Sequence, residues 1–202
     1  MKAKKKKRRP FLIVVTGGPG AGKTAILELA RKTFCEHIDI LPEAATVVFS
    51  GGFRREKSVE AQQAAQRAIF HIQREMEQLV LDENRADVIL CDRGSLDGLA
   101  YWPGQESTFF RQLGTTRKKE LERYHMVIHL RTPTAENGYN YANPYRIETP
   151  SEAAALDEKT MKAWKKHPHH FVVNGTELFL EKAETALALI RSQLPKCDHH
   201  PA

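Results

Sequence analysis

The stretch GGPGAGKT, residues 17–24, decides the fold of this chain. It satisfies the pattern G-x-x-x-x-G-K-[ST], follows a short apolar run at residues 11–15, and opens a helical pattern at residues 23–34. Glycines at these positions let successive backbone N–H groups point toward phosphate oxygens, and the following helix presents its positive end to the same anion. The motif in this context predicts a phosphate-binding loop, or P-loop, between the first strand and the first helix.

The residues of this loop are expected to share the binding of a nucleotide and its metal ion. Lys23 should reach the β- and γ-phosphates, and the hydroxyl of Thr24 should be one of the few protein ligands of Mg²⁺. The loop therefore predicts binding of Mg-ATP or Mg-GTP, and the pattern does not choose between the two. The nucleotide-binding residues predicted for the loop and the start of its helix are Gly17, Gly18, Pro19, Gly20, Ala21, Gly22, Lys23, Thr24 and Ala25.

Apolar runs of strand length alternate with helical patterns along the chain. The apolar runs lie at residues 11–15, 37–41, 88–91, 126–130 and 171–173. Because each run is continuous, we expect strands that are buried on both faces, as in parallel sheets. The helical patterns lie at residues 23–34, 59–83, 105–124, 151–166 and 177–194. We therefore predict an α/β fold with a parallel five-stranded sheet flanked by helices, whose ligands gather at the carboxyl ends of the strands.

The basic charge of the chain is concentrated near its start. Residues 2–9 contain seven Lys and Arg, and without them the 31 basic residues of the chain fall to 24, against 25 acidic residues. The near-neutral body argues against a specific nucleic-acid interface. Such a tail is either solvated or a peripheral contact with a membrane or a protein. We predict a disordered basic tail at 1–10, a single domain at 11–195 and a C-terminal tail at 196–202.

The spacing of the cysteines and the hydropathy of the chain indicate the cellular compartment in which we expect the protein. Cys35, Cys91 and Cys197 are far apart and lack the paired spacing of metal sites or disulfide frameworks. No apolar run approaches the roughly 20 residues that span a bilayer. We therefore expect free thiols and a cytoplasmic protein.

Charged residues follow the second and third strands, at the edge where the P-loop is expected. The run at 88–91 ends in Asp92, which has the form of a Walker B carboxylate that holds Mg²⁺ directly or through water. Arg93 is next, either as a group that positions acceptor or phosphate or as a local ion pair. Asp97, one helical turn further on, is expected to contact the acceptor. Glu43 is placed to accept a proton from an acceptor hydroxyl, although its position fits a surface glutamate equally well.

The stretch at 132–150 interrupts the alternation, because it is rich in Asn, Tyr, Gly and Pro. A long polar loop between a strand and a helix predicts a mobile lid. Arg146 in this loop and Arg131 at the end of the fourth strand are two candidates for neutralising charge on the transferring phosphoryl group. Asn174, after the last strand, is expected near the nucleotide base. Residues 51–55 form either a clamp for a phosphate-like group of the acceptor or a solvated loop.

These motifs together resemble the NadR-like family of predicted ATPases and kinases, often described as an AAA domain. The resemblance rests on TGGPGAGKT at 16–24, LPEAA at 41–45, CDRGSLDGLAY at 91–101, LGTT at 113–116, HLRT at 129–132, NPYRIET at 143–149 and ALDE at 155–158. It covers nearly all of the chain after the basic tail. It implies a P-loop fold of the nucleoside-monophosphate-kinase type with an arginine-bearing lid, and small-molecule kinase activity.

A more distant resemblance to deoxynucleoside kinases, which carry a glutamate after strand two and an acidic-Arg pair after strand three, implies that Glu43 is the base. We therefore predict a kinase that moves the γ-phosphoryl group of ATP to a hydroxyl of a nucleoside-like acceptor, with Thr24 and Asp92 at the metal. The predicted catalytic residues are Lys23, Glu43, Asp92, Arg93 and Arg146. The alternative is a nucleotide-gated binding module or slow NTPase, in which ATP or GTP orders the lid and the tail engages a membrane or a protein.

Overall fold

A computed structural model describes residues 9–34, 37–133, 149–174 and 179–194. At its centre is a five-stranded sheet. The strands are β1 (Phe11–Thr16), β2 (Ile38–Leu41), β3 (Val88–Asp92), β4 (Met126–Leu130) and β5 (His170–Val173). They lie in the order β2-β3-β1-β4-β5, and every neighbouring pair is parallel. The predicted parallel sheet is confirmed, and each predicted apolar run corresponds to one strand.

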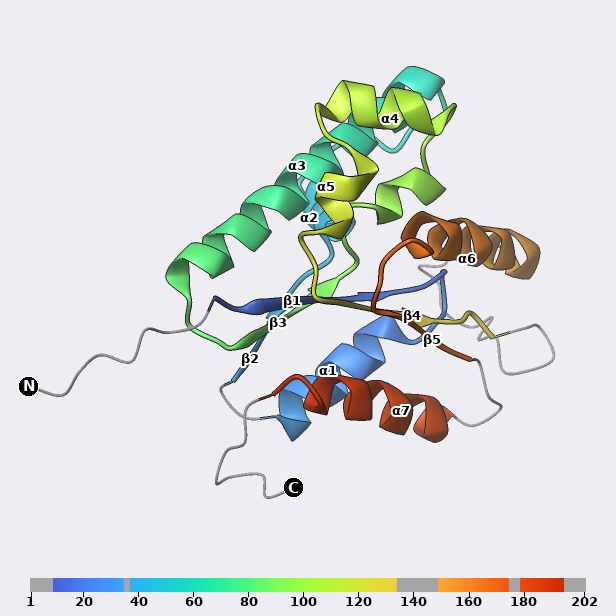
Figure 1. The fold of residues 1–202 in the computed structure, drawn as a ribbon. Helices are drawn as coiled ribbons and strands as arrows, with labels where there is room; N and C mark the ends of the chain where they lie inside the picture. The colour runs from blue at the N-terminus through green and yellow to red at the C-terminus, as the bar shows by residue number, and fades with distance from the viewer. Residues whose placement is uncertain (1–8, 35–36, 134–148, 175–178, 195–202) are drawn as a thin grey trace, which may run out of the picture.

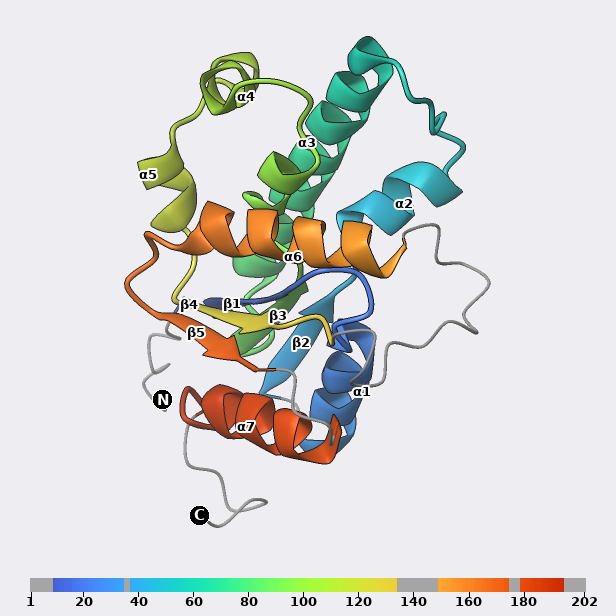
Figure 2. The same ribbon diagram turned by 90° about the vertical axis from the view of Figure 1, so that its right-hand side faces the viewer.

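Helices cover both faces of the sheet, as Figures 1 and 2 show. Helices α1 (Lys23–Thr33) and α7 (Phe179–Arg191) cover one face, where they pack against Ile13 and Val15 of β1. The intervening residues of the same strand, Leu12 and Val14, face the other side and belong to a second core cluster. Because alternate side chains of a strand point to opposite faces, this double coverage requires the continuous apolar runs seen in the sequence.

The second face carries the remaining helices (Figure 1). These are α2 (Ala44–Ser50), α3 (Val59–Glu83), the short 3₁₀ helix η1 (Asp97–Ala100), α4 (Glu106–Leu113), α5 (Arg117–Leu121) and α6 (Pro150–Trp164). Among them, α3 contributes Val80 and α6 contributes the fully buried Trp164 to the second core cluster. Within the described ranges, no helix is both long enough and apolar enough to cross a membrane.

The predicted helices agree with the structure wherever the periodic pattern is long. The pattern at 59–83 matches α3, and the pattern at 105–124 corresponds to the two helices α4 and α5. Helices α2 and η1 were not predicted, because seven and four residues are too few to establish a helical period. Most of the predicted lid and tails, including residues 134–148, lie outside the described residues.

Helix α6 begins at a well-defined position. The Thr149 side chain accepts a hydrogen bond from the Glu152 N–H, the Glu152 carboxylate accepts one from the Thr149 N–H, and Pro150 occupies the first turn. This capping box satisfies N–H groups that a helix start leaves without partners. The start of α6, and with it the register of its buried face, is therefore fixed by local sequence.

Gly94 lies where helix α6 packs closely on the sheet. A Cβ atom at this position would lie 2.8 Å from both the Trp164 ring and the Val14 side chain. Because both neighbours are fully buried, we expect Gly94→Ala to lower the free energy of unfolding by about 1–3 kcal/mol, measured by urea denaturation. Gly51→Ala at the exposed end of α2 is the matched control, with a change within about 1 kcal/mol. An unchanged stability for Gly94→Ala would contradict this packing.

Candidate active site

Three adjacent strands end at the candidate site. Strand β1 runs into the P-loop, β2 ends just before Glu43, and β3 ends in Asp92, directly before Arg93. Because β3 lies between β2 and β1 and all three are parallel, their carboxyl ends meet at one edge of the sheet. A cavity of about 500 Å³ opens at this edge. The predicted site residues that line it are Pro19, Gly20, Lys23, Thr24, Glu43, Asp92 and Arg93.

The P-loop depends on backbone angles that favour glycine. Gly17, Gly20 and Gly22 have φ angles of 140°, 77° and 92°, a region in which a side chain would be strained. Gly22 is also the N-cap of α1, so the positive end of that helix faces the loop. This geometry is that of an anion-binding helix start.

Lys23 lies across its own loop. Its Nζ donates hydrogen bonds to the carbonyl oxygens of Gly17, at 3.1 Å, and Gly18, at 3.0 Å. Burial, reinforced by the nearby Arg93 charge, lowers the pKa of Lys23 to about 8. Within the described residues no carboxylate forms an ion pair with Lys23. Its charge is therefore available to phosphate oxygens, which would raise its pKa again.

Helix α6 holds the loop from its outer side through Asp157. This carboxylate is 1% exposed, accepts a hydrogen bond of 2.9 Å from the Gly18 N–H, and lies 2.9 Å from Nε2 of the buried His129. Burial alone would raise the pKa of Asp157, but the bonds from His129 and Gly18 outweigh it, and the pKa lies below its ordinary value. Asp157 is not among the site residues predicted from the sequence. Its place on the buried face of α6, with Ala153 and Trp164, was the available signal.

Lys182 of α7 is a second anchor of the loop. Its Nζ donates to the carbonyl oxygen of Ala21 at 2.9 Å and to that of Arg131 at 2.5 Å. Burial lowers the pKa of Lys182 to about 8. The Thr132 hydroxyl adds a bond of 3.2 Å to the Pro19 carbonyl. Elements on three sides therefore position the loop without any ligand, and its preorganisation reduces the cost of binding one.

Arg93 connects the three strand ends. Its Nε donates to Glu43 Oε1 at 2.6 Å, and its Nη1 donates to Asp97 Oδ1 at 3.1 Å and to the Gly17 carbonyl at 3.2 Å. Glu43 also accepts a bond of 2.7 Å from the Thr46 hydroxyl. Burial would raise the pKa of Glu43, but Arg93 and then Thr46 outweigh it and lower the pKa. Glu43 is therefore ionised at neutral pH and suited to orient a hydroxyl group.

Asp97 is the buried anchor for Arg93. It is 3% exposed, and besides Arg93 it accepts hydrogen bonds from the Thr16 hydroxyl, the Gly94 N–H and the Trp164 indole N–H. Although Asp97 lines the cavity, as expected for an acceptor contact, both of its carboxylate oxygens are already engaged by protein donors. The structure therefore points to a role in holding Arg93 in position.

The buried carboxylate of Asp92 is suited to bind a cation. Its Oδ1 is buried and has no hydrogen-bond partner among the described residues. Burial raises its pKa to about 6. Asp92 and Thr24 line the same cavity, and a buried carboxylate oxygen without a partner in the same cavity as a hydroxyl group fits a Mg²⁺ ion. Across the described part of the chain, no group of three or more His, Cys, Asp or Glu residues is arranged for a metal, so nucleotide phosphates and water would supply the remaining ligands.

Among the predicted residues outside the P-loop and the start of its helix, Arg131 and Asn174 do not line this cavity. Arg131 pairs with Asp157, at 3.1 Å, and with Glu158 on α6. Asn174 lies exposed after β5. Arg146 falls outside the described residues. Their roles in nucleotide binding and phosphoryl transfer stay predictions.

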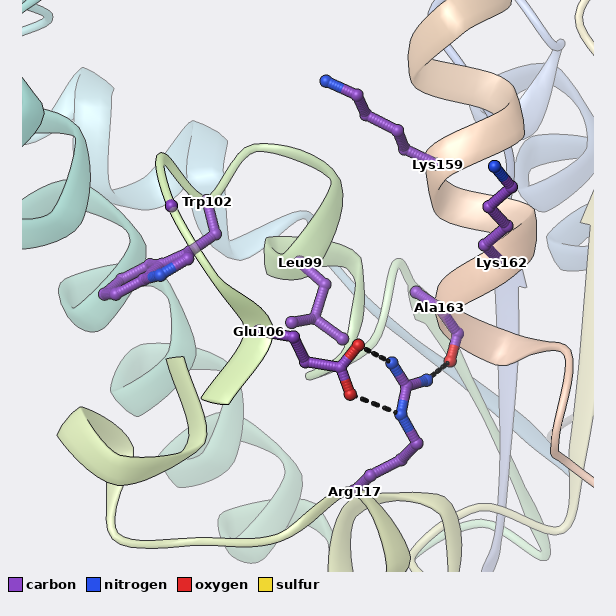
Figure 3. Close-up of a pocket in the computed structure, with 8 residues that line it drawn as sticks. Leu99, Trp102, Glu106, Arg117, Lys159, Lys162 and Ala163 are labelled. Carbon is purple, nitrogen blue, oxygen red and sulfur yellow. Dashed lines mark hydrogen bonds and ion pairs between the residues drawn. The ribbon is translucent and has the colours of Figure 1, made fainter. Parts of the chain in front are cut away.

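A second, smaller cavity of about 230 Å³ lies between the segment that follows η1 and helix α6 (Figure 3). Arg117 dominates it: its guanidinium forms a two-point ion pair with Glu106 and donates to the Ala163 carbonyl. Lys159 and Lys162 extend from α6 at its rim. This cavity contains neither the P-loop nor the strand-end carboxylates, and Arg117 serves there to tie α4 and α5 to α6.

The fold and the cavity define a P-loop nucleotide-binding protein with the fold of the nucleoside monophosphate kinases. A family model described as an AAA domain matches residues 12–178, and the chain belongs to that family. Among solved structures, it is similar to thymidylate kinase from Candida albicans, with 16% identity, a TM-score of 0.60, and coverage of 91% of this chain and 92% of that chain. At this identity the likeness shows a shared fold. A search of curated proteins finds no match. The predicted family is confirmed, whereas NadR-like substrate specificity remains a prediction.

The pKa of Lys23 makes nucleotide binding dependent on pH. At pH 8 about half of the free protein carries a neutral Lys23, and phosphate oxygens favour the charged form, so binding should take up about 0.5 proton. Uptake should be smaller at pH 7, where Lys23 is already charged. The measurement is calorimetric titration of Mg-ATP in two buffers that differ in ionisation enthalpy. Equal proton uptake by Lys23→Met would contradict this assignment.

We expect the ionised Asp92 carboxylate to lower the stability of the folded protein in the absence of Mg²⁺. Its folded pKa is raised, so its favourable contribution is present below pH 4 and is lost as the pH rises through about 6. At pH 7.5 the ionised carboxylate costs about 3 kcal/mol. We therefore expect Asp92→Asn to raise Tm by several degrees without Mg²⁺, in a thermal-unfolding measurement, while the exposed Asp39→Asn leaves it unchanged. A lower Tm for Asp92→Asn would show that Asp92 stabilises the fold.

Proposed function

We propose that this protein is a kinase that transfers the γ-phosphoryl group of Mg-ATP to a hydroxyl group of a small, nucleoside-like acceptor. The observation that carries the proposal is the Glu43–Arg93 pair, with its 2.6 Å contact, in the same cavity as Lys23 and Asp92. Binding of a nucleotide alone needs the P-loop and a metal ligand. A carboxylate in the same cavity as the P-loop, joined to it through Arg93, adds what a second substrate requires.

The proposed roles follow from the positions of the side chains. Lys23 and the N–H groups of the loop hold the β- and γ-phosphates, and Thr24 with Asp92 holds Mg²⁺, which supplies charge neutralisation at the phosphates when bound. Glu43 accepts the hydrogen bond of the acceptor hydroxyl. As the new oxygen–phosphorus bond forms, the bond to the β-phosphate oxygen breaks, and the acceptor proton passes to Glu43. Because the pKa of Glu43 is low, this transfer is expected late, when the acceptor oxygen has become acidic.

Arg93 then acts by holding Glu43 in place and by carrying positive charge beside the P-loop carbonyl of Gly17. Arg146 and Arg131 remain the proposed sources of positive charge at the transferring group, and Asn174 the proposed contact with the base. We propose ATP as the donor and a cytoplasmic setting. The latter is supported by three widely spaced cysteines that suit a reducing compartment.

The kinase proposal is tested by turnover with Mg-ATP against a panel of nucleosides, nucleotides and related metabolites, with products identified by mass. Lys23→Ala is the blank. Glu43→Gln should lower transfer by about 10²–10⁴-fold and leave ATP affinity unchanged, because its amide oxygen can still accept from Arg93. Thr46→Val, which removes the other hydrogen bond to Glu43 but keeps the carboxylate, should lower transfer by less than about tenfold.

Two outcomes would count against the proposal. Normal transfer by Glu43→Gln would remove Glu43 from the mechanism. Tight nucleotide binding with slow hydrolysis that no acceptor accelerates would favour the alternative of a nucleotide-gated binding module.

A further inference from the structure

Arg93 lies in a turn directly after β3 whose backbone is strained. Its φ of 70° is one that a residue with a side chain adopts only at a cost in free energy. The next two N–H groups hold the turn: Gly94 donates to Asp97 at 3.0 Å, and Ser95 donates to the hydroxyl oxygen of Tyr124 at 2.8 Å. Asp97 belongs to the site already described, whereas Tyr124 precedes β4 and does not line the main cavity. The turn is therefore supported from outside the site as well as from within it.

The hydroxyl group of Tyr124 is itself oriented by Glu77 of α3. It donates to Glu77 Oε1 at 2.7 Å, and the two residues are 4% and 0% exposed. A hydroxyl group has one proton, a carboxylate only accepts hydrogen bonds, and a backbone N–H only donates them. The Tyr124 proton therefore points to Glu77, which leaves a lone pair of the oxygen for the Ser95 N–H. Burial, reinforced by the Glu77 charge, raises the pKa of Tyr124 well above its ordinary value, so the hydroxyl group keeps its proton.

Glu77 is held in place by two further side chains. Gln73, which is 3% exposed, donates from Nε2 to Glu77 Oε1 at 2.8 Å, and the same nitrogen reaches the Arg93 carbonyl oxygen at 3.4 Å. The Arg123 guanidinium pairs with the other carboxylate oxygen of Glu77. Two paths thus connect one buried carboxylate to the turn, one through Gln73 and one through Tyr124.

A fully buried carboxylate lowers the stability of a protein unless its partners compensate. Taking the charge of Glu77 out of water costs free energy that the pairing with Arg123 offsets only in part. Buried polar groups of this kind can be retained because they fix one conformation. The conformation that Glu77 fixes is that of the turn that carries Arg93, whose guanidinium holds Glu43 at 2.6 Å.

We propose that Tyr124 is a positioning residue for phosphoryl transfer, which acts together with Glu77 by holding the turn that directs Arg93 toward Glu43. The inference rests on the proposed function, because Glu43 is the residue that orients the acceptor hydroxyl there. It extends the site to two buried side chains that do not line the cavity. Neither of them contacts the substrate, so their effect on catalysis passes through Arg93.

The test compares Tyr124→Phe with Thr115→Val. Tyr124→Phe removes only the hydroxyl group and keeps the ring, which packs edge-on against Trp164 with 5.3 Å between the ring centroids. Thr115→Val removes a hydrogen bond of 2.6 Å to Glu120, a second fully buried carboxylate. Within the described part of the chain, the hydrogen bonds of Glu120 go to Arg74 and Thr115 rather than to the turn. Thr115→Val is therefore the control for a hydrogen bond lost in the same region.

The expected effect is on kcat, measured well below the Tm of each variant. Tyr124→Phe should lower kcat about tenfold, because the buried Ser95 N–H loses its acceptor and the turn relaxes. The KM for ATP should stay within about twofold of the wild type. In an Arg93→Lys background the same substitution should change kcat by less than about twofold, since its effect passes through Arg93. Thr115→Val should keep the kcat of the wild type.

A second measurement does not depend on turnover. The exchange of the Arg93 Nε–H with water is followed by NMR in the nucleotide-free protein, and the signal is assigned by its absence from Arg93→Lys. Because this N–H is bonded to Glu43, Tyr124→Phe should make its exchange about tenfold faster. Thr115→Val should leave the exchange unchanged.

The results separate this inference from the proposed function. If the wild type transfers phosphate and Tyr124→Phe keeps its kcat, Tyr124 does not position Arg93 for transfer and the kinase assignment stands. A loss of kcat that is equally large in the Arg93→Lys background would also overturn the inference. If the wild type transfers to no acceptor, the kinase assignment fails, and the exchange of the Arg93 Nε–H decides. Faster exchange in Tyr124→Phe alone would support the role of Tyr124 in holding Arg93, and equal exchange in the wild type and Tyr124→Phe would overturn it.

Discussion

Arg93 forms ion pairs with two carboxylates, Glu43 and Asp97, and the arrangement of the site depends on them. Its guanidinium reaches Glu43, two residues after β2, the 3₁₀ helix after β3 and the P-loop after β1. Three neighbouring strand ends are thereby held at fixed distances. Arg93 has a positive φ of 70°, which is unfavourable for a residue with a side chain. This backbone angle, and the burial of Asp97 that accompanies it, are offset by the hydrogen bonds that the arrangement allows.

The two sides of the P-loop make different contacts. Its inner side presents Lys23 and backbone N–H groups to the cavity, while its outer side is bonded to Asp157 of α6, Lys182 of α7 and Thr132 after β4. Asp157 and Lys182 are charged groups buried among the helices, which proteins retain only when hydrogen bonds satisfy them.

The sequence predicted the fold well because the signals were local. The continuous apolar runs located all five strands, and the glycine pattern at 17–24 located the turn that binds phosphate. The position of Glu43 in the same cavity as the P-loop agrees with the expectation that ligands gather at the carboxyl edge of the sheet. The sequence could place Glu43 and Arg93 only at the same edge of the sheet. Their hydrogen bond joins residues fifty positions apart, and sequence spacing carries no information about hydrogen-bond geometry.

What the sequence did not reveal depends on tertiary contacts. Asp157 is an ordinary helix residue in the sequence, and only the packing of α6 places its carboxylate against the Gly18 N–H. The central claim, that Glu43 and Arg93 act as one unit in phosphoryl transfer, is most directly tested by a double-mutant cycle on kcat with Glu43→Gln and Arg93→Lys. We predict strong coupling, so the double variant should lie within about threefold of the slower single variant. Losses that multiply, or a wild type that transfers phosphate to no acceptor, would contradict it.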